Sequence, residues 1–329
     1  FDEVTVTDGY LDIGAYTFTA NNTISIDADG TLKIPNSGTF NADGQLNTSG
    51  EIDFTGSGSQ GDLICSSTSA NTFGTMDAAA GTVTFDGSSS QAIPAETFFN
   101  LKNSNTNGLT MSGSATVNGE LNFNVASDIT TGANTLTIGN SGSIANAADD
   151  RHINVDNTSG FLAKSTNSTS AFSFPVGNGT ILRPIKLTPS TSSSETYTVR
   201  YDDNRYGVGT VTTNFSATGG HISGYDGSNT DVTKGYYYDI TRSNSVNAVL
   251  YIEWTDEDQY GTGGNVLNAD VTGITFGYYN SSNKWDVLTS SPLGNVNSGN
   301  VTSNAFDFAG RYVTLGSLDG ENNLPIDLV

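Results

Sequence analysis

The motif Gly30-Thr-Leu-Lys-Ile34 is one of five similar segments in the first half of this chain. Each begins with glycine, continues with one spacer residue, and then places apolar residues at alternate positions. Such a repeat predicts a turn residue followed by a short strand that carries its apolar side chains on one face. The other four copies are Gly9-Tyr-Leu-Asp-Ile13, Gly50-Glu-Ile-Asp-Phe54, Gly81-Thr-Val-Thr-Phe85 and Gly119-Glu-Leu-Asn-Phe123.

The spacing of these copies predicts a β-solenoid. Gly9 and Gly30 are 21 residues apart, and Gly30 and Gly50 are 20 residues apart, which suits one coil of a small parallel β-helix. A single strand cannot bury its apolar face alone, so successive coils have to stack. We therefore expect a solenoid over residues 1–165, held together by columns of inward-facing aliphatic side chains.

The second half of the chain has a different composition and predicts a second domain. Both tryptophans, and all tyrosines except Tyr10 and Tyr16, lie after residue 190. Strand-like segments such as Val249-Leu-Tyr-Ile-Glu-Trp254 are separated by polar loops, and the sequence has no convincing helical period. We expect an all-β chain in which an antiparallel β-sandwich over residues 166–329 follows the solenoid.

The net charge, the apolar content and the cysteine count limit what this chain can bind or form. The formal net charge is −22, whereas nucleic acids and anionic membranes are bound by clustered Lys and Arg. No segment approaches the 18 apolar residues of a membrane span, so we expect no membrane insertion. The single cysteine, Cys65, cannot form an internal disulfide and is expected in the core. The chain begins directly in the strand-like Val4-Thr-Val6, and we expect any export signal to have been removed from it.

The acidic residues of the predicted solenoid do not form an evident catalytic group. A glycoside hydrolase needs two carboxylates about 5–10 Å apart on one face, and these acids are spread along the sequence. Asp12, Asp53 and Glu120 occupy outward-facing strand positions and predict a solvated acidic ladder on one outer face. A lyase would also need a base, and only Lys33 and Lys102 are available in the first 150 residues.

The two histidines also give no sign of catalysis. His152 and His221 lie far from any nucleophile motif, and we expect both at the surface or in loops. The sequence therefore predicts no enzyme activity.

Oxygen-rich acidic loops make calcium the one cofactor that the sequence indicates. Extracellular modules bind this hard cation through carboxylates. None of these loops has the full EF-hand pattern, and the alternative is that they are turn residues facing water. The predicted calcium ligands are Asp202, Asp203, Asp256 and Asp258.

Aromatic residues of the second half predict a site for stacking on sugar rings. In the strand-like Gly235–Ile240, alternation places Tyr236 and Tyr238 on the core side and Tyr237 on the opposite, exposed side. Trp254 keeps phase with apolar neighbours and is expected in the core. The predicted ligand-binding residues are Tyr237 and Trp285.

Several segments in a fixed order resemble a known family. The run Gly81–Ile93 is followed by Phe174-Pro-Val-Gly-Asn-Gly179, Tyr238-Asp-Ile240, Ile252-Glu-Trp254 and finally Asn323-Leu-Pro-Ile-Asp-Leu328. As a set they resemble the repeat region of large surface proteins of the Bacteroidota that the type IX secretion system exports. In that family the last segment commonly precedes further modules or the C-terminal sorting domain. No sorting domain follows Val329, so we expect an internal fragment or a processed chain.

Repeats and resemblance together predict a role outside the cell, on the bacterial surface or secreted. We expect a non-catalytic structural or adhesive module that acts as a rigid spacer. Its expected partners are other cell-surface proteins or glycans, and also a second copy that pairs end to end through residues 1–8 into filaments. The alternative function is a polysaccharide-binding or polysaccharide-active module.

Overall fold

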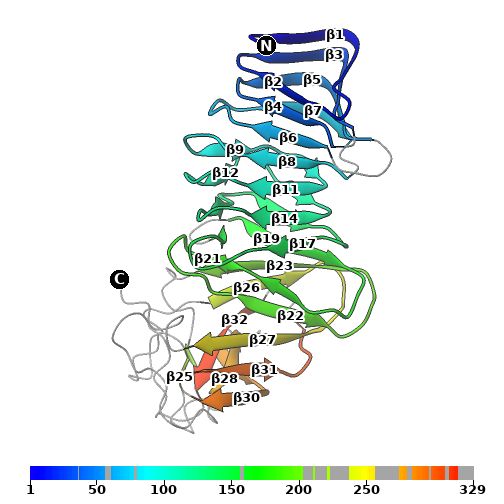
Figure 1. Cartoon of the computed structure of the whole chain (residues 1–329). Helices are drawn as coiled ribbons and strands as arrows, with labels where there is room; N and C mark the ends of the chain where they lie inside the picture. The colour runs from blue at the N-terminus through cyan, green and yellow to red at the C-terminus, as the bar shows by residue number, and fades with distance from the viewer. Residues whose placement is uncertain are drawn as a thin grey trace. The chain divides into compact units, whose positions relative to one another are not determined.

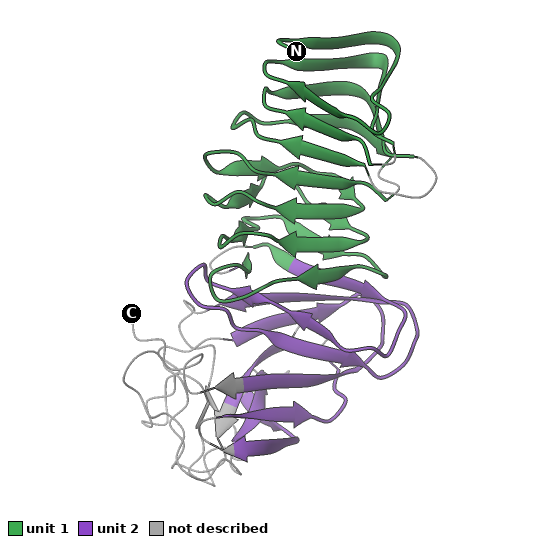
Figure 2. Ribbon diagram, viewed as in Figure 1, with its two compact units in different colours: residues 1–154, 159–161 green, residues 155–158, 162–329 purple. Residues whose placement is uncertain are grey.

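A computed structural model describes residues 1–35, 37–55, 61–77, 80–155, 159–202, 210–211, 221–222, 237–255, 274–279, 284–295, 298–307 and 311–317. Every regular element in these ranges is a β-strand. The chain divides into two compact units, one of residues 1–154 and 159–161 (unit 1) and one of residues 155–158 and 162–329 (unit 2), as Figure 2 shows. The boundary predicted after residue 165 falls inside strand β19 (Phe161–Thr166).

Unit 1 is a β-solenoid of about eight coils, as the sequence predicts. Its strands pair in parallel from each coil to the next, and Figure 1 shows them stacked in chain order. One sheet is seven-stranded and consists of β2 (Thr17–Ala20), β4 (Thr39–Ala42), β6 (Asp62–Cys65), β8 (Thr82–Phe85), β11 (Asn100–Asn103), β14 (Glu120–Phe123) and β17 (Ser143–Ala145).

The remaining strands of unit 1 form the other sides of the coils. The first four coils use the long strands β1 (Val4–Asp12), β3 (Ile24–Lys33), β5 (Leu46–Asp53) and β7 (Thr72–Asp77). The register between these strands shifts partway along them, for instance between Val6 and Asp8. Later coils use the short strands β9 (Gln91–Ile93), β10 (Thr97–Phe98), β12 (Leu109–Met111), β13 (Ala115–Val117), β15 (Ile129–Thr130), β16 (Thr135–Ile138) and β18 (Ile153–Asn154).

Two columns of inward-facing side chains run through the seven-stranded sheet, which confirms the predicted arrangement. All members are buried except Phe18 and Ile144, which are half-buried. Stacking identical positions removes apolar surface from water at every coil, at about 25 cal/mol per Å². The first column is Phe18, Phe40, Leu63, Val83, Leu101, Leu121 and Ile144, and the second is Ala20, Ala42, Cys65, Phe85, Asn103 and Phe123.

The repeated glycines are explained by close approach of neighbouring coils more than by turns. A Cβ atom at Gly30 would lie 2.4 Å from the carbonyl oxygen of Val6, and one at Gly50 would lie 2.1 Å from that of Asp27. Both glycines lie inside strands with negative φ, so the predicted turn role is wrong for them. Gly9 differs, because it has a φ of 75° and open space around it.

All but one of the described strands of unit 2 lie in two sheets. The first contains β19, β23 (Glu195–Asp202), β26 (Tyr237–Arg242), β32 (Arg311–Ser317), β28 (Ile274–Tyr279), β29 (Lys284–Leu288) and β24 (Thr210–Val211), with β25 (His221–Ile222) beside β32. The second contains β20 (Phe172–Phe174), β22 (Ile185–Pro189), β27 (Ala248–Thr255), β31 (Ser298–Ser303) and β30 (Ser290–Asn295). Pairing is antiparallel except between β24 and β29, which are parallel. A further short strand is β21 (Val176–Gly177).

Candidate functional site

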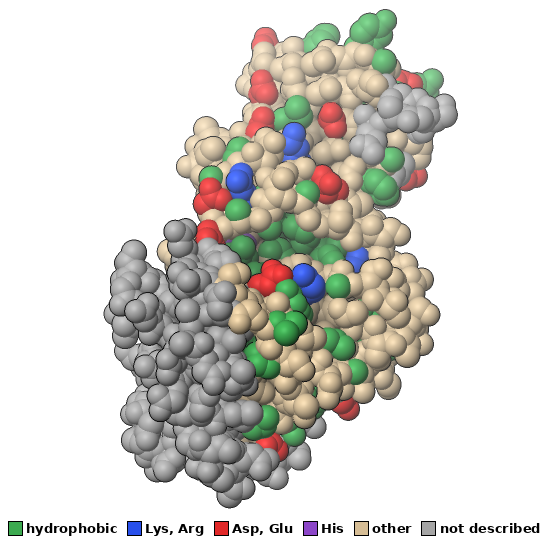
Figure 3. Space-filling model, turned by 60° about the horizontal axis from the view of Figure 1, so that its bottom comes forward, with side chains coloured by type: hydrophobic (Ala, Val, Ile, Leu, Met, Phe, Trp, Pro, Cys, Tyr) green, Lys and Arg blue, Asp and Glu red, His purple; other side chains and the backbone are tan. Residues whose placement is uncertain are grey.

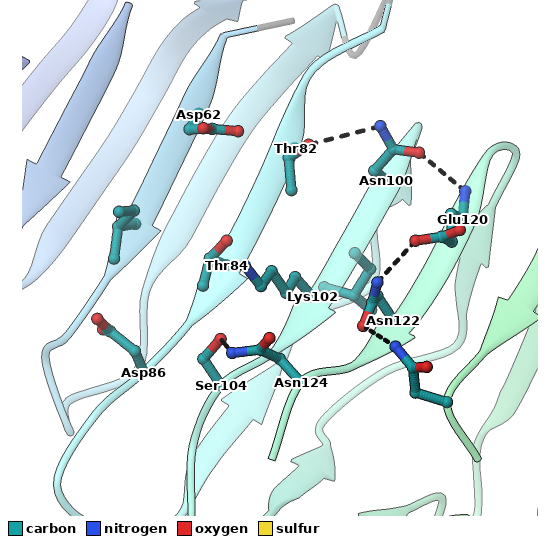
Figure 4. A pocket seen from close by; sticks show the side chains of 13 residues that line it. Asp62, Thr82, Thr84, Asp86, Asn100, Lys102, Ser104, Glu120, Asn122 and Asn124 are labelled. Carbon is teal, nitrogen blue, oxygen red and sulfur yellow. Dashed lines mark hydrogen bonds between the residues drawn. The ribbon is translucent and has the colours of Figure 1, made fainter.

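A polar groove lies on the outer face of the seven-stranded sheet, over β6, β8, β11 and β14. Its volume is about 610 Å³ (Figure 4). The inward positions of these strands are apolar except for Asn103, so the alternate outward positions carry most of the polar side chains that line the groove. The exceptions among the lining residues are Ile64 and Leu101.

The side chains of the groove form rows that repeat from coil to coil. In the middle row, Thr84 of β8 pairs with Lys102 of β11, and Lys102 pairs with Asn122 of β14. Equivalent atoms of neighbouring coils are about 4.8 Å apart in a parallel sheet. The groove therefore presents hydroxyl, ammonium and amide groups at a regular spacing along the coil stack.

Hydrogen bonds between coils, and one within β14, hold these side chains in place. The Asn100 side-chain amide donates to Thr82 Oγ1 at 3.4 Å and accepts from the backbone N–H of Glu120 at 2.8 Å. Asn122 Nδ2 donates to Glu120 Oε1 at 2.7 Å, and Asn146 Nδ2 donates to Asn122 Oδ1 at 3.1 Å (Figure 4). The lining is thus ordered before any ligand arrives.

Lys102 is the one cation among the described residues that line the groove. Its ammonium makes no hydrogen bond or ion pair with any residue in the described part of the chain. Burial raises the pKa of Asp62, while a hydrogen bond with Thr82 and the charge of Lys102 act in the opposite direction. Two further carboxylates, Asp86 and Glu120, also line the groove, which gives it an excess of negative charge.

Two of these carboxylates, Asp62 and Glu120, lie far apart along the coil stack. Asp62 and Glu120 occupy equivalent positions three coils apart, a backbone separation of about 14 Å, whereas paired catalytic carboxylates lie within about 5–10 Å. Asp62 and Glu120 lie at one end of their strands, and Asp86 lies beyond the other end, as Figure 4 shows. The Asp86 carboxylate accepts a hydrogen bond from Ser66 Oγ at 2.8 Å.

The predicted acidic ladder is only partly present. Asp12 and Asp53 lie on the same outer face, with Lys33 between them in register, and the Lys33 ammonium is 4.0 Å from the Asp53 carboxylate. Glu120 belongs to the other sheet, so placing it on the same ladder is wrong. On the face drawn in Figure 3, acidic side chains are scattered among neutral ones.

One predicted calcium ligand lies in the described part of the chain. Asp202 ends β23 and is 2% exposed, and its carboxylate accepts a hydrogen bond from the Tyr237 hydroxyl at 3.3 Å. Asp203, Asp256 and Asp258 lie outside the described residues. Among the residues that are described, no group of three or more His, Cys, Asp or Glu is placed to hold a metal ion. Calcium binding at these four residues stays a prediction.

The predicted sugar-binding aromatics are buried. Tyr237 is 4% exposed and Trp285 is 2% exposed. The two side chains form a buried cluster, and the partly buried Tyr279, Val287 and Tyr312 pack against that cluster. The prediction that Tyr237 is exposed is therefore wrong, because both neighbouring tyrosines in β26 are enclosed whichever way they point. Glycan binding by Tyr237 and Trp285 stays a prediction.

His152 also departs from expectation. It is fully buried, so its predicted surface position is wrong. Its backbone N–H donates to Asp128 Oδ1 at 2.8 Å, and its Nδ1 lies 3.3 Å from the same oxygen. The side chain of His221 lies outside the described residues.

Comparisons with known proteins provide no relative for this chain. No family model, no curated protein and no solved structure matches it. No helix in the described ranges is long and apolar enough to cross a membrane. The function has to be argued from the geometry of the two units.

Proposed function

We propose that this protein is a non-catalytic structural or adhesive module of a bacterial cell surface, with unit 1 as a rigid spacer. The observation that carries the proposal is the unbroken register of the seven-stranded sheet, in which every coil repeats the inward columns of the coil before it. Each coil contacts only its neighbours, so the length of such a stack grows in proportion to the number of coils.

The cellular context of the proposal comes from sequence. The ordered segments that resemble type IX secretion substrates of the Bacteroidota support an extracellular location, with other surface proteins or glycans as partners. Within unit 2 we propose that the two sheets pack as an antiparallel β-sandwich. Alternating burial along β22 and in the first half of β23 supports this, since one face of these segments is enclosed; the last four residues of β23 are all buried.

The test of the spacer role adds one coil to the full chain on a cell surface. Residues 100–119 form one repeat, and their tandem duplication should move a tag placed beyond the insertion by about 4.8 Å per added coil. If the protein lies on the cell surface, protease added to intact cells should also digest it. Protection from protease in intact cells, or a tag position that does not change with coil number, contradicts the proposal.

End-to-end assembly is a further part of the proposal. Strand β1 is the edge of its sheet, and edge strands offer unpaired backbone groups to other chains. Phe1, beside it, is 72% exposed. The nearby acids Asp2, Glu3 and Asp8 repel a second copy, so filaments should require salt that screens charge. Electron micrographs that show only isolated particles at high protein concentration and high salt would exclude filaments.

A further inference from the structure

We infer that the groove over β6, β8, β11 and β14 binds a segment of uncharged polysaccharide that lies along the coil stack. This goes beyond the spacer role. The two ideas fail separately, because a chain that binds no glycan keeps its coil-to-coil length.

The position of the groove excludes recognition by strand pairing. It lies on the face of a sheet whose backbone N–H and C=O groups are already used between coils. A ligand there is recognised by side chains alone. An extended peptide would need apolar pockets for its side chains, and Ile64 is the one outward apolar residue among those that line the groove.

The chemistry of the lining matches a polyhydroxylated chain. Sugar hydroxyls both donate and accept hydrogen bonds, and the groove offers hydroxyl, amide, carboxylate and ammonium groups in regular rows. Lys102, in the middle row, keeps its three N–H donors available toward the groove, as no described residue pairs with its ammonium. A repeating ligand can meet one polar group of the middle row at each of three successive coils, from Thr84, Lys102 and Asn122.

The charge of the groove selects against anionic ligands. Three carboxylates, from Asp62, Asp86 and Glu120, oppose the single ammonium of Lys102. An acidic polysaccharide or a nucleic acid would be repelled. The class of ligand that remains is a neutral glycan, held by many weak hydrogen bonds.

The test is affinity electrophoresis of the full chain through gels that contain one soluble polysaccharide each. Galactomannan, mixed-linkage β-glucan and arabinoxylan are the neutral probes, and polygalacturonate is the anionic probe. We expect at least one neutral polymer to retard the chain and polygalacturonate to have no effect. Lys102→Gln should weaken that retardation about tenfold, the loss expected for a charge-assisted hydrogen bond.

The chain provides a matched control. Lys33→Gln removes the same charge from a different outer face and should leave retardation unchanged. Thr84→Val, which keeps side-chain shape and removes a hydroxyl from the groove, should also weaken binding. Circular dichroism melts identify any variant that fails to fold. The inference would be overturned if polygalacturonate alone retarded the chain, or if no polymer did. It would also be overturned if Lys102→Gln and Lys33→Gln were retarded to the same extent.

Discussion

Buried amide side chains link the coils of unit 1 where apolar columns alone leave backbone groups unpaired. Asn105 is fully buried, and its Nδ2 donates to Ser89 O at 2.7 Å and to Gln91 Oε1 at 2.9 Å. Gln91 Nε2 in turn donates to Cys65 O, in the preceding coil, at 2.8 Å. Burying an amide side chain costs free energy of folding unless its hydrogen bonds are made. Each of these amides therefore fixes the position of the neighbouring coil to which it is bonded.

Cys65 gives a chemical report on the folded state of unit 1. It is fully buried in an inward column, and burial, reinforced by the charge of Asp86, raises the pKa of its thiol. The thiolate is the reactive form. We expect no reaction with Ellman's reagent at pH 8 in buffer and one thiol per chain in denaturant. Complete labelling of the native protein within seconds would contradict the buried position.

Removal of one amide tests the network. Asn105→Ala removes the donor to Ser89 O and Gln91 Oε1 and the acceptor of the Asn107 backbone N–H, and should lower the free energy of unfolding of unit 1 by about 1–3 kcal/mol. The exposure of Cys65 in a urea series provides the measurement. Asn124→Ala is the control: this exposed amide donates to Ser104 Oγ at 3.2 Å and to no other described residue, and its loss should change stability by less than about 0.5 kcal/mol. Equal effects of the two variants would count against the network.

Glu195 makes unit 2 sensitive to acid. Burial would raise the pKa of this carboxyl, but hydrogen bonds from Asn244, Val246, Ser243 and Thr196 together outweigh it and lower the pKa. A group with a lowered folded pKa stabilises the protein fully above its unfolded pKa, here about 4.3. That stabilisation is lost as the pH falls below this value through the folded pKa.

We expect the midpoint temperature of thermal unfolding, measured by tryptophan fluorescence, to decrease as the pH is lowered from 5 to 3. Glu195→Gln should cost about 2–3 kcal/mol at pH 7, and its difference from the unsubstituted protein should shrink as the pH falls. A constant difference across this range would mean that Glu195 does not titrate with folding.

At the scale of the element, close stacking of coils explains why glycine recurs in the motif. A methyl group at Gly50 would meet the carbonyl oxygens of Asp27 at 2.1 Å and Gly30 at 2.2 Å. Both are backbone atoms of β3, so a methyl group at Gly50 fits only if the β3 backbone moves away from β5.

Gly50→Ala should therefore lower the free energy of unfolding of unit 1 by about 1–3 kcal/mol or more, the usual range for overpacking. Thr7→Ala, at an exposed position of β1, should change it by less than about 0.5 kcal/mol. Hydrogen exchange of the β3 and β5 amides locates the effect. An unchanged stability for Gly50→Ala would show that the coils are less closely stacked than described.

Alternation in the sequence was sufficient to predict the solenoid and its inward columns. It could not assign each copy of the motif to a side of the coil: the copies at Gly30 and Gly50 lie in the long strands, whereas those at Gly81 and Gly119 precede strands of the seven-stranded sheet. Coil length varies, so the spacing alone does not give the side. The sequence therefore predicts Glu120 on the same ladder as Asp12 and Asp53, although its copy of the motif lies on a different side of the coil.

The groove was missed for the same reason. Thr84, Lys102 and Asn122 are far apart in sequence, and only the register of three strands makes them neighbours. The available signal was a polar residue between two inward positions in each of β8, β11 and β14. In β26 alternation misled, because a strand enclosed on both faces buries Tyr237 as well as Tyr238.

At the scale of the whole molecule, the chain combines a repetitive stack with a tyrosine-rich second unit and a net charge of −22. That charge keeps like molecules apart at low salt. We expect unit 1 to behave as one rigid body, because its inward columns continue from coil to coil along the seven-stranded sheet.

A distance between spin labels at Thr19→Cys and Ala145→Cys tests this claim most directly. Both residues lie in one outward row, which continues through Asn41, Ile64, Thr84, Lys102 and Asn122. Six coil-to-coil steps predict a backbone separation of about 29 Å, and Cys65, being buried, should take no label. We expect one narrow distribution near that distance. A broad distribution, or a mean that departs from it by several coil spacings, would contradict the account.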